Sequence, residues 1–125
     1  MVVLIIPLEY VSKSVNSLPL MTDKILAFTG KLKANPTNRF HRYNLAQAYF
    51  EEDDFLHAEK LFSECFAMAD DWMMAALGLG KCYLALERVD DARVILTKTV
   101  DLARKQGHDD PLEEAESLLE NCSST

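Results

Sequence analysis

A pattern of residues that recurs every 34 positions constrains the fold most strongly. Phe62 has Phe28 and Leu96 at this spacing on its two sides, and Tyr49 has Tyr83. The other matches join apolar or small residues: Leu45 with Leu79, Ala46 with Gly80, Ala58 with Ala92, and Phe55 with Val89. Matches at one fixed period indicate repeated structural units that must stack on their neighbours to bury their apolar faces.

Each unit is predicted to be a pair of helices. Between Phe55 and Ala69, apolar residues follow one another at steps of three and four, which places them on one face of a single amphipathic helix. The chain has only four glycines and four prolines, and this scarcity also favours helix. The same periodicity predicts six helices, at residues 22–35, 39–52, 55–69, 72–86, 89–106 and from 110 onwards.

Local signals predict where these helices begin and end. Thr22 reads as a helix start, Pro36 stops the first helix, and Gly107 closes the fifth. Pro111 at the first helical position predicts the start of the sixth. The acidic cluster at 51–54 is predicted to be a turn and an N-cap rather than a cation site, because it lacks the spacing of a calcium loop.

The motif Leu45-Ala46-x-x-Tyr49, Ala58-x-x-x-Phe62, followed by Leu79-Gly80-x-x-Tyr83, Ala92-x-x-x-Leu96, resembles the tetratricopeptide repeat. The resemblance covers residues 39–106 and extends back to Phe28 and Pro36. It implies an all-α superhelix of helical hairpins, a right-handed solenoid, in which Ala46 and Gly80 lie where neighbouring helices cross. Arg42 and Ala76 depart from the pattern, which often has tryptophan at these places, and Asp70 and Arg104 replace its closing proline.

This resemblance implies one helical domain at residues 21–121. It would consist of a half-repeat at 22–38, repeats at 39–72 and 73–106, and a capping helix at 110–121. Residues 1–20 are predicted to be an appendage to this domain, and residues 122–125 a tail.

Composition argues against several classes of function. The net charge of −7, without any basic run longer than two residues, argues against nucleic acid as the partner. The apolar run of six residues before Pro7 is too short to cross a membrane, and the features of a signal peptide are absent. Cys65, Cys82 and Cys122 are odd in number and lack a disulfide-type spacing, which favours a cytoplasmic location.

The sequence also offers no constellation for catalysis, metal binding or a cofactor. His41, His57 and His108 are far apart in the predicted helices, without ligands at a metal-binding spacing. Nucleotide-binding and nucleophile motifs are absent, and the carboxylates lie on predicted solvated faces and turns, where they form no acid–base pair. The prediction is a chain that is not an enzyme and needs no cofactor.

In a superhelix of this kind, the first helix of each pair lines the concave side. The residues that would face this groove are Phe40, Tyr43, Gln47, Phe50, Met74, Leu77, Lys81 and Leu84. Because most of them are apolar, we expect the groove to bind an apolar or amphipathic peptide, or a helix, of a partner protein. These side chains are expected to contribute little to the stacked core.

Two alternatives concern the same groove. The chain could form a homo-oligomer, with the groove filled by its own N-terminal segment or by a second copy. The tetratricopeptide subfamily that grips a C-terminal carboxylate uses lysine and asparagine side chains, whereas Tyr43, Gln47, Met74 and Gly78 stand at the matching places here. A receptor for chaperone tails is therefore not supported.

Overall fold

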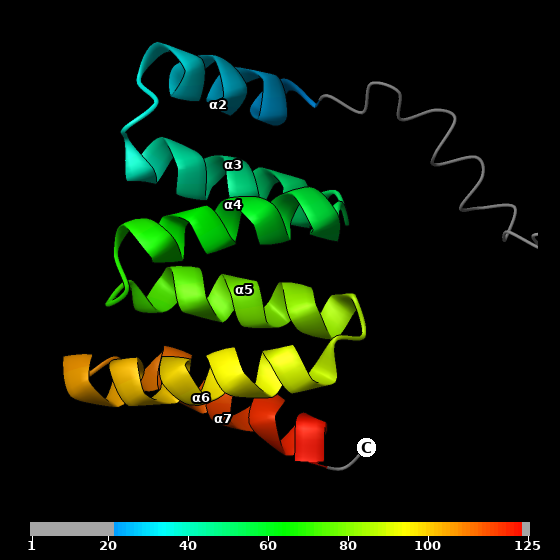
Figure 1. Ribbon diagram of the computed structural model, residues 1–125, viewed down its shortest axis with the longest axis vertical. Helices are drawn as coiled ribbons and strands as arrows, with labels where there is room; N and C mark the ends of the chain where they lie inside the picture. Colours follow the sequence, from blue (N-terminus) through cyan, green and yellow to red (C-terminus); the bar gives the residue numbers. More distant parts are fainter. Residues whose placement is uncertain (1–21, 124–125) are drawn as a thin grey trace, which may run out of the picture.

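Six helices lie side by side in sequence order through the described part of the chain (Figure 1). The computed structural model describes residues 22–123, so the predicted appendage at 1–20 and the last two residues of the predicted tail lie outside it. The helices are α2 (Asp23–Ala34), α3 (Arg39–Glu51), α4 (Phe55–Met68), α5 (Met73–Ala85), α6 (Val89–Gln106) and α7 (Asp109–Ser123). The predicted all-α superhelix of helical hairpins is confirmed.

Side-chain caps fix the starts of the first three helices. The Thr22 hydroxyl accepts a hydrogen bond from the Ile25 amide at 3.2 Å. The Asn38 side chain accepts bonds from two amides of the first turn of α3, and Asp54 accepts one from the His57 amide at 3.3 Å. These bonds satisfy amides that have no partner within the helix. The prediction that the acidic cluster ends in an N-cap is therefore confirmed.

The turns inside the two helical hairpins repeat as closely as the helices do. Asp53 and Glu87, 34 residues apart, both adopt the left-handed conformation, with φ of 59° and 61°. After each of them the chain makes the same bond: the Asp54 amide donates to the Tyr49 carbonyl at 3.0 Å, and the Arg88 amide donates to the Tyr83 carbonyl at 2.8 Å. These bonds close the C-terminal ends of α3 and α5.

The last helix is longer than predicted. It begins at Asp109 rather than at residue 110 and continues to Ser123, so Pro111 is its third residue and not its first. Proline is tolerated there because the amides of the first helical turn have no partner within the helix. Cys122 is only 1% exposed and packs in the core, so assigning it to a tail was wrong.

Both glycines of α5 lie where another helix comes close. A Cβ atom added to Gly80 would lie 2.5 Å from a Leu96 methyl carbon, and one added to Gly78 would lie 2.7 Å from the Phe62 ring. Phe62 and Leu96 are completely buried. The predicted crossing at Gly80 is confirmed, and a second one exists at Gly78.

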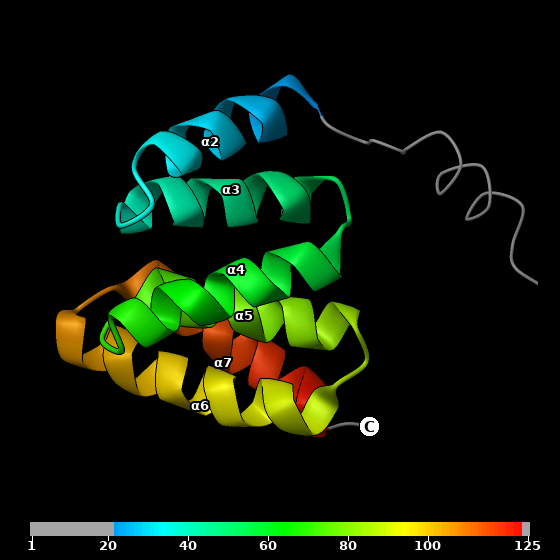
Figure 2. The same ribbon diagram turned by 45° about the horizontal axis from the view of Figure 1, so that its top comes forward.

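Helix α7 packs on both α6 and α5 and covers the end of the stack (Figure 2). Its residues Ala115 and Cys122 form one buried cluster with Leu77 of α5 and Leu96 of α6. The outer surface of α7 remains acidic, with Glu113, Glu116 and Glu120 among its exposed residues. This helix therefore has the capping role that the sequence predicts for it.

Candidate functional site

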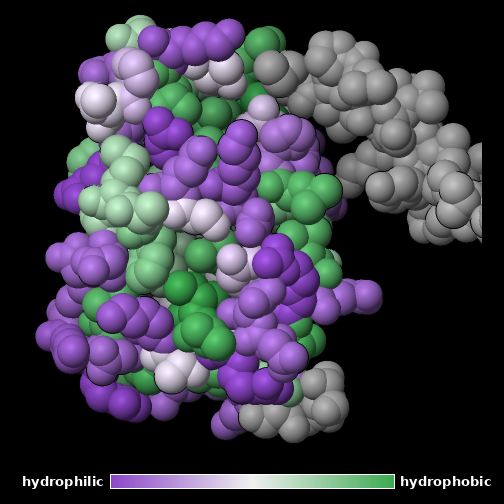
Figure 3. Space-filling view, viewed as in Figure 1, coloured by the Kyte–Doolittle hydropathy of each residue, from purple (hydrophilic) through white to green (hydrophobic). Residues whose placement is uncertain are grey.

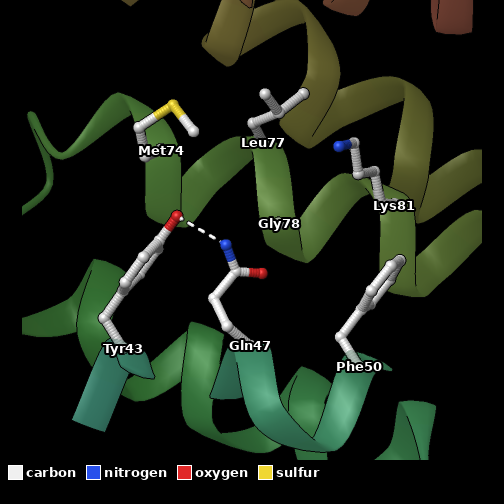
Figure 4. A pocket seen from close by; sticks show the side chains of 7 residues that line it. All are labelled: Tyr43, Gln47, Phe50, Met74, Leu77, Gly78 and Lys81. Atoms are coloured by element: carbon white, nitrogen blue, oxygen red, sulfur yellow. Dashed lines mark hydrogen bonds between the residues drawn. The ribbon is translucent and has the colours of Figure 1, made fainter. Parts of the chain in front are cut away.

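A pocket lies between α3 and α5 (Figure 4). Side chains from α3 extend toward those of α5 across it. Its lining residues are Tyr43, Gln47, Phe50, Met74, Leu77, Gly78 and Lys81. Six of the eight residues predicted for the groove thus come together around one space, and the other two, Phe40 and Leu84, do not line it.

Gly78 is the lining residue outside the eight predicted for the groove, although the sequence resemblance places it at a clamp position of the carboxylate-binding subfamily. Because it has no side chain, the Phe62 ring can lie against the helix backbone at this point. Two signals were available: this clamp position and the presence of two glycines inside one helix, of which the 34-residue register explained only Gly80.

The polar groups of the pocket are arranged in two sets. The Gln47 amide donates a hydrogen bond to the Tyr43 hydroxyl at 3.1 Å (Figure 4). Burial, reinforced by the nearby Cys65, raises the pKa of Tyr43, although the Gln47 bond acts in the opposite direction. The phenol therefore stays protonated at neutral pH. At the other end, the Lys81 ammonium forms an ion pair with Glu114 of α7 at 2.5 Å.

The size of the pocket limits what it can hold. Its cavity volume is about 40 Å³, and the pocket is partly open to solvent. Sites for drug-sized ligands usually enclose roughly 300–1,000 Å³. This pocket therefore suits one or two side chains of a peptide better than an enclosed small molecule.

Two predicted groove residues are placed differently from the expectation. Leu77 reaches the pocket but is only 2% exposed, because α7 packs over it. Leu84 is half-buried and packs against the same cluster. The expectation that groove side chains contribute little to the core is therefore wrong for these two leucines.

Phe40 belongs to an aromatic cluster beside the pocket, which we define as Phe40, Tyr43 and Trp72. The Trp72 ring is stacked on Tyr43 with a centroid distance of 5.1 Å, and Phe40 meets it edge-on at 5.6 Å. Phe40 is 58% exposed. The sequence analysis did not place Trp72 near the groove. Its position directly before the first residue of α5 was the signal that could have placed it there.

On the face seen in Figure 3, hydrophobic patches alternate with hydrophilic ones. Among residues 22–123, no helix is long and apolar enough to cross a membrane. No group of three or more potential metal ligands occurs within that range either.

Burial raises the pKa of the Cys65 and Cys82 thiols to about 12, which keeps them protonated and unreactive at neutral pH.

No family model and no curated protein match this sequence. Solved structures do. The solution structure of a tetratricopeptide repeat domain protein from Salinibacter ruber is 30% identical, with 72% of this chain and 91% of that chain covered and a TM-score of 0.64. A crystal structure of a tetratricopeptide repeat domain protein from Salinibacter ruber is also 30% identical, with 69% of this chain and 97% of that chain covered and a TM-score of 0.63. The chain belongs to the tetratricopeptide repeat family.

A third solved structure shares the fold at lower identity. It is the first tetratricopeptide repeat domain of Spaghetti (RPAP3) bound to the HSP90 peptide SRMEEVD. That domain is 23% identical to this chain, with 80% of this chain and 75% of that chain covered and a TM-score of 0.70.

In this tetratricopeptide repeat chain, one residue that departs from the family pattern makes polar contacts with neighbouring elements. Arg42, at a place where the pattern often has tryptophan, forms an ion pair with Glu64 of α4 at 2.7 Å. Its guanidinium also donates to the Pro36 carbonyl at 2.9 Å. An ion pair and a hydrogen bond thus join α3 to α4 and to the preceding turn.

The four residues at the clamp positions of the carboxylate-binding subfamily all line the pocket. They are Tyr43, Gln47, Met74 and Gly78. Together they present a phenol, an amide, a thioether and bare backbone, without the lysines that would hold a terminal carboxylate. The pocket is therefore chemically different from that clamp.

Proposed function

We propose that this tetratricopeptide repeat domain is a non-catalytic interaction module. The pocket between α3 and α5 binds an apolar side chain from an extended or helical segment of another protein. The observation that carries the proposal is this pocket, in which apolar Phe50 and Met74 surround the hydrogen-bonded pair of Tyr43 and Gln47. An apolar hollow with a few polar groups is typical of sites that anchor and orient a ligand.

Exposed apolar surface next to the pocket supports the proposal. Phe40 is 58% exposed and Met74 is 38% exposed. A large aromatic residue and a flexible thioether at the edge of a pocket are suited to contact a peptide, because buried aromatic and aliphatic anchors supply most of the binding energy at protein interfaces. The RPAP3 domain, which has this fold, was solved with a peptide bound.

The proposal is tested by selecting random peptides from a phage library on the protein. The selected peptides are synthesised, and their dissociation constants are measured by fluorescence anisotropy for the wild type, Met74→Glu and Leu56→Glu. Leu56 is 68% exposed and lies on α4, away from the pocket lining. Both substitutions place a carboxylate on an exposed apolar position, so they form a matched pair.

We expect Met74→Glu to weaken peptide binding at least about tenfold and Leu56→Glu to leave it within twofold. Both variants should melt within a few degrees of the wild type. Peptides that bind both variants equally well would overturn the proposal. Sedimentation of the same proteins tests the alternative from the sequence: a dimer that Met74→Glu alone dissociates would show that the groove is filled by a second copy.

A further inference from the structure

Arg39 lies on the aromatic cluster and has no carboxylate partner among the described residues. Its guanidinium lies 5.2 Å from the centre of the Phe40 ring and 5.3 Å from that of the Trp72 ring. Arg39 is exposed, and within residues 22–123 no carboxylate comes within ion-pair distance of it. The positive charge is therefore held in place by rings that do not neutralise it.

The other four arginines of the described chain all have a carboxylate partner. The pairs are Arg42 with Glu64, Arg88 with Asp91, Arg93 with Asp90, and Arg104 with Glu116. The protein has 20 acidic and 13 basic residues, so carboxylates are not scarce. Arg88 is the closest counterpart, because it also lies over a ring, that of Tyr83 at 4.5 Å, but it pairs with Asp91 at 2.9 Å.

The unpaired charge is next to the pocket. Arg39 lies over Trp72, Trp72 stacks on Tyr43, and Tyr43 lines the pocket. The cation at the other end of the pocket, Lys81, is already paired with Glu114. The groove therefore has an available positive charge at the Arg39 end and a neutralised one at the Lys81 end.

We propose that the segment bound in the groove carries an aspartate or glutamate side chain next to its apolar anchor, and that Arg39 binds this carboxylate. The inference rests on the proposed function and adds the chemistry of the partner. Stacking on Phe40 and Trp72 holds the guanidinium in one orientation, so a carboxylate can accept two of its hydrogen bonds at little entropic cost. Two ring contacts separate the Arg39 guanidinium from Tyr43 at the pocket: Arg39 to Trp72 at 5.3 Å and Trp72 to Tyr43 at 5.1 Å. An extended chain advances about 3.3 Å per residue, so the acidic residue should lie within about three residues of the apolar anchor.

The test is a double-mutant cycle between protein and peptide. For a peptide selected on the wild type, the acidic residue nearest the apolar anchor is replaced by its amide, Asp by Asn or Glu by Gln. Both peptides are made with a free and with an amidated C-terminus. Their dissociation constants are measured for the wild type, Arg39→Gln and the matched control Arg88→Gln.

We expect Arg39→Gln to weaken binding of the acidic peptide about fivefold or more and binding of the amide peptide less than twofold. Arg88→Gln should have no such selective effect. The selectivity should also decrease at high salt and survive amidation of the C-terminus, since the carboxylate belongs to a side chain.

Three results would overturn the inference. In the first, Arg39→Gln weakens the binding of both peptides equally, which would give Arg39 a packing role only. In the second, Arg39→Gln weakens the binding of neither peptide. In the third, amidation removes the selectivity, which would identify a terminal carboxylate as the ligand. If Met74→Glu still weakens peptide binding at least about tenfold in any of these cases, the proposed function stands without this inference. If Met74→Glu has no effect, the proposed function itself fails.

Discussion

Helices α3 and α5 occupy equivalent places in consecutive repeats, but they are covered to different extents. On α3, Tyr43 is half-buried and its neighbour Phe40 is exposed. On α5, the residue 34 positions after Tyr43 is Leu77, which is 2% exposed. Each helix packs against the helix that begins the next unit, α5 in one case and α7 in the other. Leu77 is enclosed by residues of both α6 and α7, whereas the Tyr43 ring stacks on Trp72 beside the pocket.

The comparison teaches that one register position can serve either the core or a binding surface. The repeat places Tyr43 and Leu77 at equivalent positions of their helices, but the side chains that pack around each of them decide whether it is available to a partner. Exposed Phe40 lies on α3, whereas α5 contributes buried Leu77 and exposed Met74 to the apolar part of the pocket wall. Substitutions at paired positions can break or sharpen this comparison.

The largest effect is expected from Leu77→Ala. Removing a buried leucine side chain leaves a cavity among Ala92, Leu96 and Ala115, and such truncations lower the free energy of unfolding by about 2–5 kcal/mol. The control is Phe40→Ala on α3, which should cost less than about 1 kcal/mol because Phe40 is mostly exposed. Urea unfolding followed by circular dichroism measures both. Similar losses in the two variants would contradict the difference in coverage.

A second test concerns the helix crossing at Gly80. Gly80→Ala places a methyl group against completely buried Leu96, and overpacking of this kind costs about 1–3 kcal/mol. The counterpart in the first repeat, Ala46, already has a Cβ atom, and it is completely buried.

Gly30→Ala is the matched control for this test. A Cβ atom at Gly30 in α2 would meet nothing within 4 Å, so the same substitution should stabilise the protein by roughly 0.4–1 kcal/mol through helix propensity. Opposite shifts of the melting temperature are expected. If Gly80→Ala were also stabilising, Leu96 would have room to move, and the crossing would not require glycine.

A third test uses the pH dependence of stability at Cys82, whose counterpart on α3 is Ala48. Burial raises the pKa of the Cys82 thiol to about 12, with a smaller contribution from Glu59. An unfolded thiol loses its proton near its ordinary pKa of about 8.5–9, so above that pH the unfolded state binds fewer protons than the folded state. The free energy of unfolding should therefore fall as pH rises from about 9 to 12.

The substitution Cys82→Ala copies the residue of the first repeat and removes this contribution. We expect the alkaline decrease to become shallower by up to about 1.4 kcal/mol per pH unit. Buried Cys65 and the tyrosines would still contribute. Urea midpoints between pH 8 and about 10.5 provide the measurement. An unchanged pH slope would show that the Cys82 thiol is not protected from ionisation.

The smallest effect is expected at the paired turn residues Asp53 and Glu87. Both have positive φ, a conformation that costs glutamate more than aspartate, because the shorter side chain of aspartate can form local hydrogen bonds. Glu87→Gly should raise the free energy of unfolding by about 0.5–1 kcal/mol, and Asp53→Gly should raise it less. Thermal melts of the two variants compare the turns directly. A loss of stability in Glu87→Gly would mean that the glutamate side chain contributes more than the strain costs.

The sequence by itself determined the repeat, the helices and the face of α3 and α5 that forms the pocket. These features depend on residues that are close in the chain or separated by a constant 34 positions, so periodicity and capping residues are sufficient to predict them. The starts at Thr22 and Asp54 and the closing Gly107 follow from short-range hydrogen bonds and backbone conformation, which act within a few residues.

Only the tertiary structure decided which side chains on that face are available to a partner. The burial of Leu77 depends on α7, more than 30 residues further along the chain, and so does the neutralisation of Lys81 by Glu114. The stacking of Trp72 on Tyr43 and the unpaired charge of Arg39 also arise where separate helices meet. Burial and ion pairing depend on distances between elements, and a repeat period does not contain those distances.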